Sequence, residues 1–157
     1  MLGQSWHRAG QPQLAKKHLE MVVTAAEQQS RPSRSLYEQR ILGAAHRLLG
    51  DLAAEQGRRR EAIDHFRVAV DAYPDDADAY VGLGAMLAAE GRLEEAAACF
   101  TEATRLHPDS AAAHYNLGAL LTRMGRAGEA RPHYQRAAAL LPAARDVESV
   151  EPRDRED

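Results

Sequence analysis

Apolar side chains recur along this chain at the spacing of one face of an α-helix. Ala62, Phe66 and Ala69 stand at positions i, i+4 and i+7, so they project from the same side of a predicted helix. The triplet recurs twice, at Ala96, Phe100 and Ala103 and at Ala130, Tyr134 and Ala137. The copies are offset by 34 residues, and this offset indicates an internal repeat built from helices.

Glycines and prolines recur with the same offset and divide each copy into two helices. The glycine of each Leu-Gly pair falls inside the first helix, where it costs about 1 kcal/mol relative to alanine, so we expect another helix to approach it closely. A second glycine follows at a common place for a helix to end. The recurring glycines are Gly50, Gly84 and Gly118 and then Gly57, Gly91 and Gly125. Pro74 and Pro108 disfavour helix in the residue before them, and the next helix can be capped by Asp75 or Asp76, and by Asp109 or Ser110.

The N-terminal part holds a weaker copy at an offset of 47 residues, which aligns Leu2-Gly3 with Leu49-Gly50. The 13 extra residues include Ser35-Leu36-Tyr37-Glu38, which has the sequence of a capping box and predicts a lengthened helix from Leu36 to Gln56. We expect a partial repeat at 1–29, a connector and the start of the lengthened helix at 30–42, three repeats at 43–76, 77–110 and 111–142, and a charged tail at 143–157. The tail has room for a short capping helix before a disordered end.

The composition favours helices and excludes several classes of protein. Hydrophobic residues make up 45% of the 157 residues but aromatic residues only 5%, a balance that suits close-packed helices better than a β-sandwich. The net charge of −3 lacks the basic excess of a nucleic-acid-binding protein. The single cysteine, Cys99, excludes an intramolecular disulfide, and no segment approaches the ~20 apolar residues that span a membrane. We therefore expect a soluble, cytoplasmic protein.

The 34-residue period and the order Leu-Gly, Ala, Phe or Tyr, Ala, Pro resemble the tetratricopeptide repeat family. The resemblance implies an all-α fold, a right-handed α-solenoid of antiparallel helix pairs, whose concave face is lined by the first helix of each repeat. The sequence departs from the family early in the first helix, where an aromatic residue is common and His46, Tyr80 and His114 stand instead. We expect these two histidines to act as flat substitutes in the core.

The candidate reactive groups do not form a known catalytic or metal-binding motif. The Gly-Leu-Gly sequence at 82–84 lacks the third glycine of a phosphate-binding loop and falls within a predicted helix. His18, His65 and His133 recur at one position of the second helix, with Cys99 in the remaining copy. Packed helices lie about 10 Å apart, whereas zinc ligands lie about 2.0–2.3 Å from the metal. We interpret the series as a half-buried structural stripe, and we predict no cofactor, no metal and no enzymatic activity.

The positions that line the concave face in the family carry small apolar residues in the middle and charged residues at both ends. They are Arg47, Asp51 and Glu55 in the first full repeat, Val81, Ala85 and Ala88 in the second, and Tyr115, Ala119 and Arg123 in the third. We expect a shallow groove that takes a peptide or a helix, with Val81 and Tyr115 as apolar anchors. Its charged residues would set the orientation of the partner. Asp51 stands where the carboxylate clamp of some family members has asparagine, which argues against that kind of site.

The sequence therefore predicts a non-catalytic protein-protein interaction scaffold with a protein or peptide partner, no nucleic acid and no membrane span. One alternative is an accessory segment of a larger multidomain enzyme. Another is a self-associating assembly module, possible as a homo-oligomer because Leu2 and Trp6 lack half a repeat to pack against at the N-terminal face. A third is that the groove positions are only the surface of a structural spacer.

Overall fold

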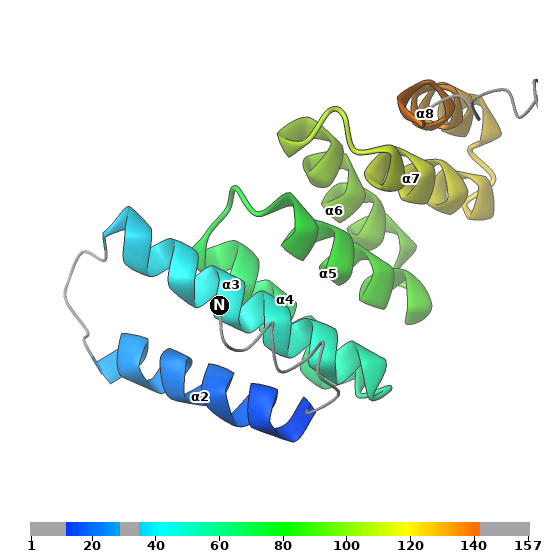
Figure 1. Cartoon of the computed structure of the whole chain (residues 1–157). Helices are drawn as coiled ribbons and strands as arrows, with labels where there is room; N and C mark the ends of the chain where they lie inside the picture. The colour runs from blue at the N-terminus through cyan, green and yellow to red at the C-terminus, as the bar shows by residue number, and fades with distance from the viewer. Residues whose placement is uncertain (1–11, 29–34, 142–157) are drawn as a thin grey trace, which may run out of the picture.

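The computed structural model describes residues 12–28 and 35–141. Those residues form seven helices and no β-strand: α2 (Pro12–Gln28), α3 (Leu36–Glu55), α4 (Arg59–Ala72), α5 (Ala77–Ala89), α6 (Leu93–Leu106), α7 (Ala111–Arg123) and α8 (Ala127–Leu140). Figure 1 shows the helices stacked in chain order, with α3/α4, α5/α6 and α7/α8 as antiparallel pairs. The predicted all-α solenoid of helix pairs is confirmed.

Some predicted segments lie outside the described residues. These are the half repeat around Leu2 and Trp6, the polar connector around Pro32, and the tail after Leu141. Within 12–28 and 35–141, no helix combines the length and the apolar character that crossing a bilayer requires.

The lengthened helix α3 begins at the predicted capping box. The Ser35 side chain accepts a hydrogen bond from the Glu38 backbone N–H at 3.3 Å, and the Ser35 N–H donates to Glu38 Oε2 at 2.8 Å. The two bonds satisfy N–H groups that the start of a helix otherwise leaves without partners. Because of this start, α3 is 20 residues long, whereas α5 and α7 have 13 residues each.

Each helix pair is joined by a tight turn at the predicted glycine. Gly57, Gly91 and Gly125 have φ angles of 71°, 81° and 76°, in the left-handed region that favours glycine. At the first turn, the Arg58 N–H donates to the Ala53 carbonyl at 2.9 Å and the Gly57 N–H donates to the Ala54 carbonyl at 2.9 Å. This pair of bonds is the Schellman motif, which satisfies the last carbonyls of the helix.

Each connection between helix pairs ends at an N-cap residue. The sequence offers two candidate residues for each cap. Asp76 caps α5, because its Oδ1 accepts from the Ala79 N–H at 3.2 Å. Ser110 caps α7 in the same way, accepting from Ala113 at 3.2 Å. In both turns the cap is the second residue after the proline rather than the first.

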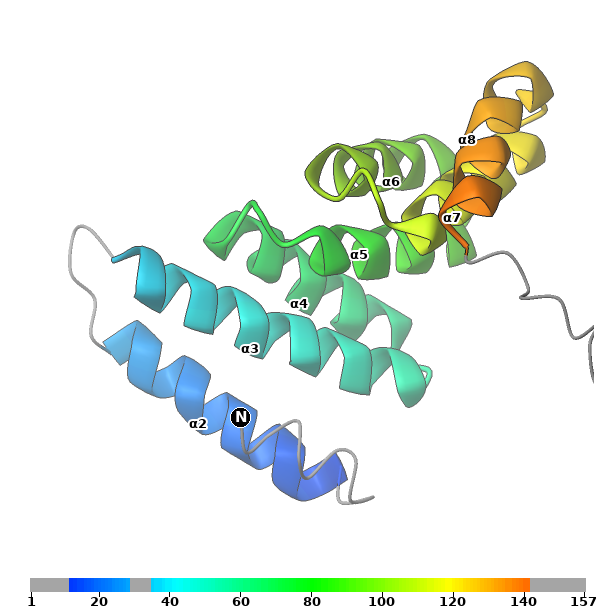
Figure 2. The ribbon, with the colours of Figure 1, turned by 45° about the horizontal axis from the view of Figure 1, so that its top comes forward.

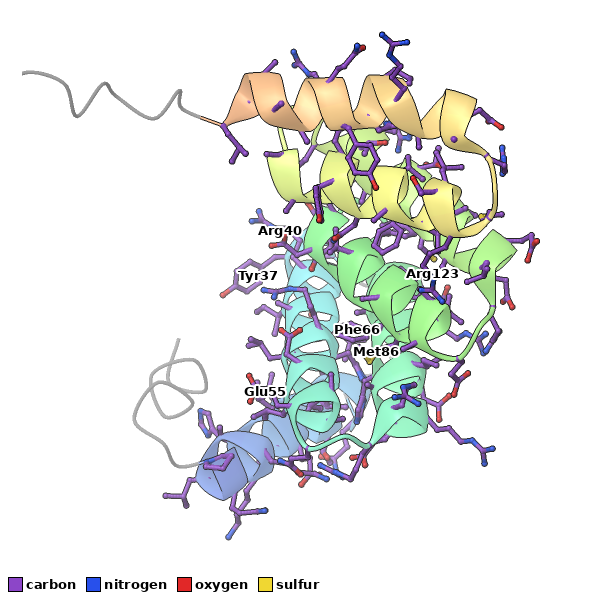
Figure 3. All side chains as sticks on the ribbon, turned by 90° about the vertical axis from the view of Figure 1, so that its right-hand side faces the viewer. Tyr37, Arg40, Glu55, Phe66, Met86 and Arg123 are labelled. Atoms are coloured by element: carbon purple, nitrogen blue, oxygen red, sulfur yellow. The ribbon has the colours of Figure 1, made fainter. Side chains whose placement is uncertain are left out.

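The aromatic residue of each second helix fills the space between neighbouring helices. Phe66 is 1% exposed and Phe100 is 3% exposed. A Cβ added to Gly50 on α3 would lie 2.9 Å from the Phe66 ring, and one added to Gly82 on α5 would lie 2.5 Å from it. Figure 3 shows Phe66 inside the stack. The expectation that glycine permits a close helix approach is confirmed for Gly50, Gly84 and Gly118, which face Phe66, Phe100 and Tyr134.

The stack curves with its first helices on the inner side. Helix α3 contacts α5, and α5 contacts α7, in addition to the contacts between helices that follow one another in the chain. The second helices, α4, α6 and α8, do not form comparable contacts with one another within the described residues. Because neighbouring elements approach more closely on the inside of a curve, α3, α5 and α7 form the concave face (Figure 2).

Candidate functional site

The nine groove positions identified from the sequence lie on the three inner helices. Each helix contributes three of them at a spacing of three or four residues, so that they follow one helical face. Glu55, Tyr115 and Arg123 are exposed, whereas Arg47, Asp51, Val81, Ala85 and Ala119 are half-buried. Ala88 differs from the other eight, because its side chain is buried in the hydrophobic core and does not line the surface.

Arg47 joins α3 to the beginning of α5. Its Nε lies 3.2 Å from Asp76 Oδ2, and its Nη1 lies 3.4 Å from Asp51 Oδ2. Asp76 uses its other oxygen to cap α5, so one carboxylate fixes both a helix start and an arginine of the groove. The charged group at this end of the groove is therefore held in place by the fold.

Arg123 joins α7 to the end of α5. Its Nη2 donates to the Ala88 carbonyl oxygen at 3.3 Å, in the last turn of α5. That carbonyl also accepts a hydrogen bond from the Gly91 N–H at 3.2 Å, in the turn after α5. A guanidinium has five N–H donors, so Arg123 retains further donors while it makes this contact.

The middle of the groove is apolar and shallow. Val81 and Ala85 pack partly against the main hydrophobic core and leave the rest of their side chains accessible. Tyr115 is 59% exposed, and its ring lies edge-on to Tyr134 with a centroid separation of 5.7 Å. The groove thus presents one large aromatic side chain beside a floor of small ones.

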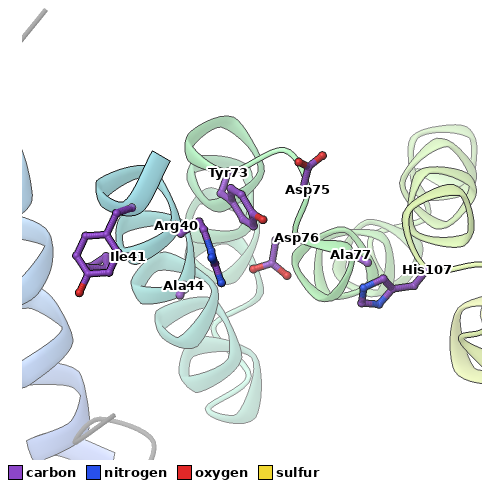
Figure 4. Close-up of a pocket in the computed structure, with 9 residues that line it drawn as sticks. Arg40, Ile41, Ala44, Tyr73, Asp75, Asp76, Ala77 and His107 are labelled. Atoms are coloured by element: carbon purple, nitrogen blue, oxygen red, sulfur yellow. The ribbon is translucent and has the colours of Figure 1, made fainter. Parts of the chain in front are cut away.

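A pocket of about 590 Å³ lies where α3, the α4–α5 turn and the α6–α7 turn meet. Figure 4 shows Arg40 from α3 and Tyr73 and Asp76 from the α4–α5 turn projecting into the same space, with His107 across from them. The guanidinium carbon of Arg40 lies 5.8 Å from the centroid of the Tyr73 ring, a cation–π contact. The lining consists of Tyr37, Arg40, Ile41, Ala44, Tyr73, Asp75, Asp76, Ala77 and His107.

This pocket was missed in the sequence, although one of its causes was visible there. Tyr37, Arg40 and Ile41 come from the N-terminal turns by which α3 exceeds α5 and α7. In Figure 3, Tyr37, Arg40 and Glu55 project from the same side of α3, so the pocket adjoins the predicted groove. The capping box at Ser35 predicted the extra helical turns of α3. It did not predict that the α4–α5 and α6–α7 connections would form a pocket beside them.

The described residues include one cysteine, Cys99, whose thiol is half-buried. Burial raises the pKa of the Cys99 thiol to about 11, so this group is protonated at neutral pH and is a poor nucleophile. Within residues 12–28 and 35–141, no three His, Cys, Asp or Glu side chains are grouped closely enough to hold a metal ion.

Solved structures with the same fold support this description. MamA is 21% identical, with a TM-score of 0.72 over 88% of this chain and 74% of that chain. YrrB, a TPR protein with an unusual peptide-binding site, is 22% identical, with a TM-score of 0.69 over 90% of this chain and 66% of that chain. The second TPR of Spaghetti (RPAP3), solved with an HSP90 peptide, is 19% identical, with a TM-score of 0.62 over 64% of this chain and 93% of that chain.

Comparison of the sequence with family models assigns most of the repeat region. No curated protein sequence matches the chain. Two tetratricopeptide repeat models match residues 47–100 and 111–144, and a TPR repeat model matches residues 84–125. Together these matches cover 47–144, more than half of the chain, in the part that forms the three helix pairs. The chain belongs to the tetratricopeptide repeat family.

Proposed function

We propose that the protein is a non-catalytic interaction scaffold that holds a peptide or a helix of a partner protein on the concave side of α3, α5 and α7. The observation that carries the proposal is the row of accessible small side chains at Val81, Ala85 and Ala119, flanked by the arginines of α3 and α7. Two structures of the same fold agree with it, since YrrB has a peptide-binding site and the RPAP3 repeat was solved with a peptide.

The small side chains allow the backbone of a partner to approach the floor of the groove. Tyr115 offers a large apolar surface, and tyrosine is enriched among the residues that contribute most to interfaces. Arg47 and Arg123 are fixed by contacts within the protein, so they lose little side-chain entropy when a partner carboxylate approaches. The charge of Arg123 would orient an acidic segment at the α7 end, whereas the charge of Arg47 is already paired with Asp51 and Asp76.

The pocket beside Tyr37 would anchor a bulky side chain of the same partner. Its volume of about 590 Å³ falls within the range of small-molecule pockets, ~300–1,000 Å³. Tyr37 and Tyr73 supply aromatic surface, while Arg40 and Asp75 supply polar groups. A segment seated there could continue along the groove, because Ala44 lines the pocket and lies one helical turn from Arg47.

The proposal is tested by affinity capture from a lysate of the source organism, followed by mass spectrometry. The double variant Val81→Glu, Tyr115→Ala places a charge on the groove floor and removes its aromatic side chain. The matched control, Val68→Glu, places the same charge on an exposed position of α4, outside the concave face. We expect the groove variant to lose at least about tenfold of the captured partner, the effect of one strong interface residue. Equal capture by the groove variant and the wild type would contradict the proposal.

A further inference from the structure

Two histidine pairs connect the helices within α3/α4 and within α7/α8. His46 Nδ1 lies 3.1 Å from His65 Nδ1, and His114 Nδ1 lies 3.2 Å from His133 Nδ1. The two pairs occupy equivalent positions of the 34-residue repeat. The pair α5/α6 has Tyr80 and Cys99 at these positions, so it serves as an internal control that lacks a histidine pair.

The geometry within each pair is that of a hydrogen bond between two ring nitrogens. The ring centroids are 5.3 Å apart in the first pair and 5.5 Å apart in the second, well beyond the nitrogen separations. The rings therefore meet with their Nδ1 atoms toward one another, instead of overlapping face to face. In such a bond one nitrogen donates a proton and the other must present a lone pair.

The α7/α8 pair has an assigned donor and acceptor. His114 Nε2 lies 3.1 Å from the Pro108 carbonyl oxygen, which can only accept, so Nε2 carries the hydrogen. The Nδ1 atom of the neutral His114 ring then has a free lone pair, and His133 Nδ1–H donates to it. The space between the two rings holds one proton.

The pair accepts one further proton without breaking, but not two. A first proton enters at His133 Nε2, which takes no part in the bond, and leaves Nδ1–H donating to His114. A second proton can enter only at His114 Nδ1, where it meets the N–H of His133. Two donors and two positive charges then face one another at hydrogen-bond distance, and the bond is lost.

The surroundings keep the rings on the second helices neutral. Burial lowers the pKa of His65, and the charge of Lys16 on α2 lowers it further, against the opposing charges of Glu61 and Asp64 on α4 and Glu20 on α2. Burial also lowers the pKa of His133, and the charge of His114 acts in the same direction. His46 is only 6% exposed, so a charge on its ring would also be poorly solvated.

We propose that the two histidine pairs are acid-sensitive joints, which hold α3 to α4 and α7 to α8 at neutral pH, weaken as the pairs take up protons, and release the helices when a pair takes up its second proton. An unfolded histidine has a pKa of about 6.5, and His65 and His133 have lower pKa values in the fold. The unfolded chain therefore binds more protons below about pH 6.5, and stability falls as the pH drops from there through the lowered pKa values.

The joints lie in the two helix pairs that flank α5. His46 is on α3 and His114 is on α7, so acid would loosen both outer walls of the concave face while α5/α6 keeps its packing. That a bound partner would be released at low pH is a consequence that rests on the proposed function. The stability of the protein alone does not depend on that function.

The test is the free energy of unfolding by denaturant at pH 7.5 and pH 5.0, in reducing buffer without any partner. One variant carries the residues of α5/α6 in both pairs, His46→Tyr, His65→Cys, His114→Tyr and His133→Cys. The converse variant, Tyr80→His with Cys99→His, installs a third pair. We expect the unfolding constant of the wild type to rise at least about tenfold on acidification, the effect of one pKa unit in one group. The fourfold variant should lose most of that rise, and the converse variant should exceed it.

A second measurement, made on the wild type alone, tests the proposal even if the variants do not fold. In the wild type, nitrogen NMR of the imidazoles should place hydrogen on Nε2 of His114 and on Nδ1 of His133 at neutral pH, with coupling across the bond. An identical pH dependence in the wild type and the fourfold variant would overturn the proposal, as would hydrogen on Nε2 of both rings. A groove that binds nothing would leave these outcomes unchanged, so the two proposals fail separately.

Discussion

Phe66 shows how one residue sets the distance between three helices. From its own position on α4, its ring lies against both Gly50 of α3 and Gly82 of α5. The sequence predicted that another helix approaches Gly50 closely, since the Leu-Gly pair at 49–50 recurs in every copy, but it did not identify Phe66 as the residue in contact. It did not predict the contact at Gly82, because Gly82 has no glycine at the equivalent positions, which are occupied by Leu48 and Asn116.

Because of its contact with Phe66, Gly82 should tolerate substitution less well than Gly128, another glycine inside a helix. A Cβ there would lie 2.5 Å from the buried Phe66 ring, whereas a Cβ at Gly128 in α8 meets nothing within 4 Å. We expect Gly82→Ala to lower the free energy of unfolding by about 1–3 kcal/mol through overpacking. Gly128→Ala should raise it by up to about 1 kcal/mol through helix propensity. Urea denaturation measures both, and a stabilising Gly82→Ala would contradict the packing described for Phe66.

At the scale of single residues, the sequence predicted the groups that act locally and the close helix approach at the recurring glycines, but it missed the histidine contacts between helices. The capping box at Ser35 and the left-handed glycines depend on residues close in the chain, and both were predicted. In the sequence, the histidines of the second helices form a series, because they recur at the same position of successive repeats. Their contacts instead run between the two helices of a pair, where His46 meets His65 at a separation of 19 residues.

Helix α8 differs from the other second helices by an internal proline. Pro132 lies in the sixth position of α8, where it has no N–H to donate to the carbonyl of residue i−4, Gly128. Ala98 occupies the equivalent position of α6. Both residues are exposed, so the difference concerns the backbone of the helix and not the packing of its core.

Replacing this proline should stabilise the molecule. We expect Pro132→Ala to raise the free energy of unfolding by up to about 3 kcal/mol, because the substitution restores a backbone hydrogen bond and removes a steric clash. The reciprocal change, Ala98→Pro in α6, should lower it by a similar amount. Thermal unfolding followed by circular dichroism measures both, and a destabilising Pro132→Ala would show that the fold requires the proline.

At the scale of elements, the helices and their order were predictable because each copy repeats its own boundaries. Glycine ends the first helix and proline precedes the next, so errors of position do not accumulate along the array. The pocket was not predictable in this way. It requires the lengthened start of α3, the turn at Tyr73 and the turn at His107 to come together in space.

At the scale of the whole molecule, the described helices present a curved face whose two ends differ. At the α3 end lies the pocket with Tyr37, which is 72% exposed, and at the α7 end lies Tyr115. The repeat explains the curvature, because each pair adds the same rotation to the stack. The asymmetry comes from the insertion before the first full repeat, which lengthens only α3.

The asymmetry predicts that Tyr37 contributes to partner binding but not to stability. We expect Tyr37→Ser to weaken binding of the captured partner by about tenfold or more, as loss of an aromatic anchor does. Leu36→Ser is the matched control, because Leu36 is also well exposed, at 64%, but does not line the pocket. Calorimetric titration with the purified partner compares the two, and equal affinities would exclude the pocket as an anchor.

The central claim, that partners bind on the concave face of α3, α5 and α7, is tested most directly by photo-crosslinking. A benzophenone derivative of phenylalanine would replace Tyr115 on the inner face of one sample and Val68 on the outer helix α4 of another, two positions that are both exposed. The account predicts a covalent adduct with the partner from position 115 and none from position 68. An adduct formed only from position 68, or equally from both, would contradict it.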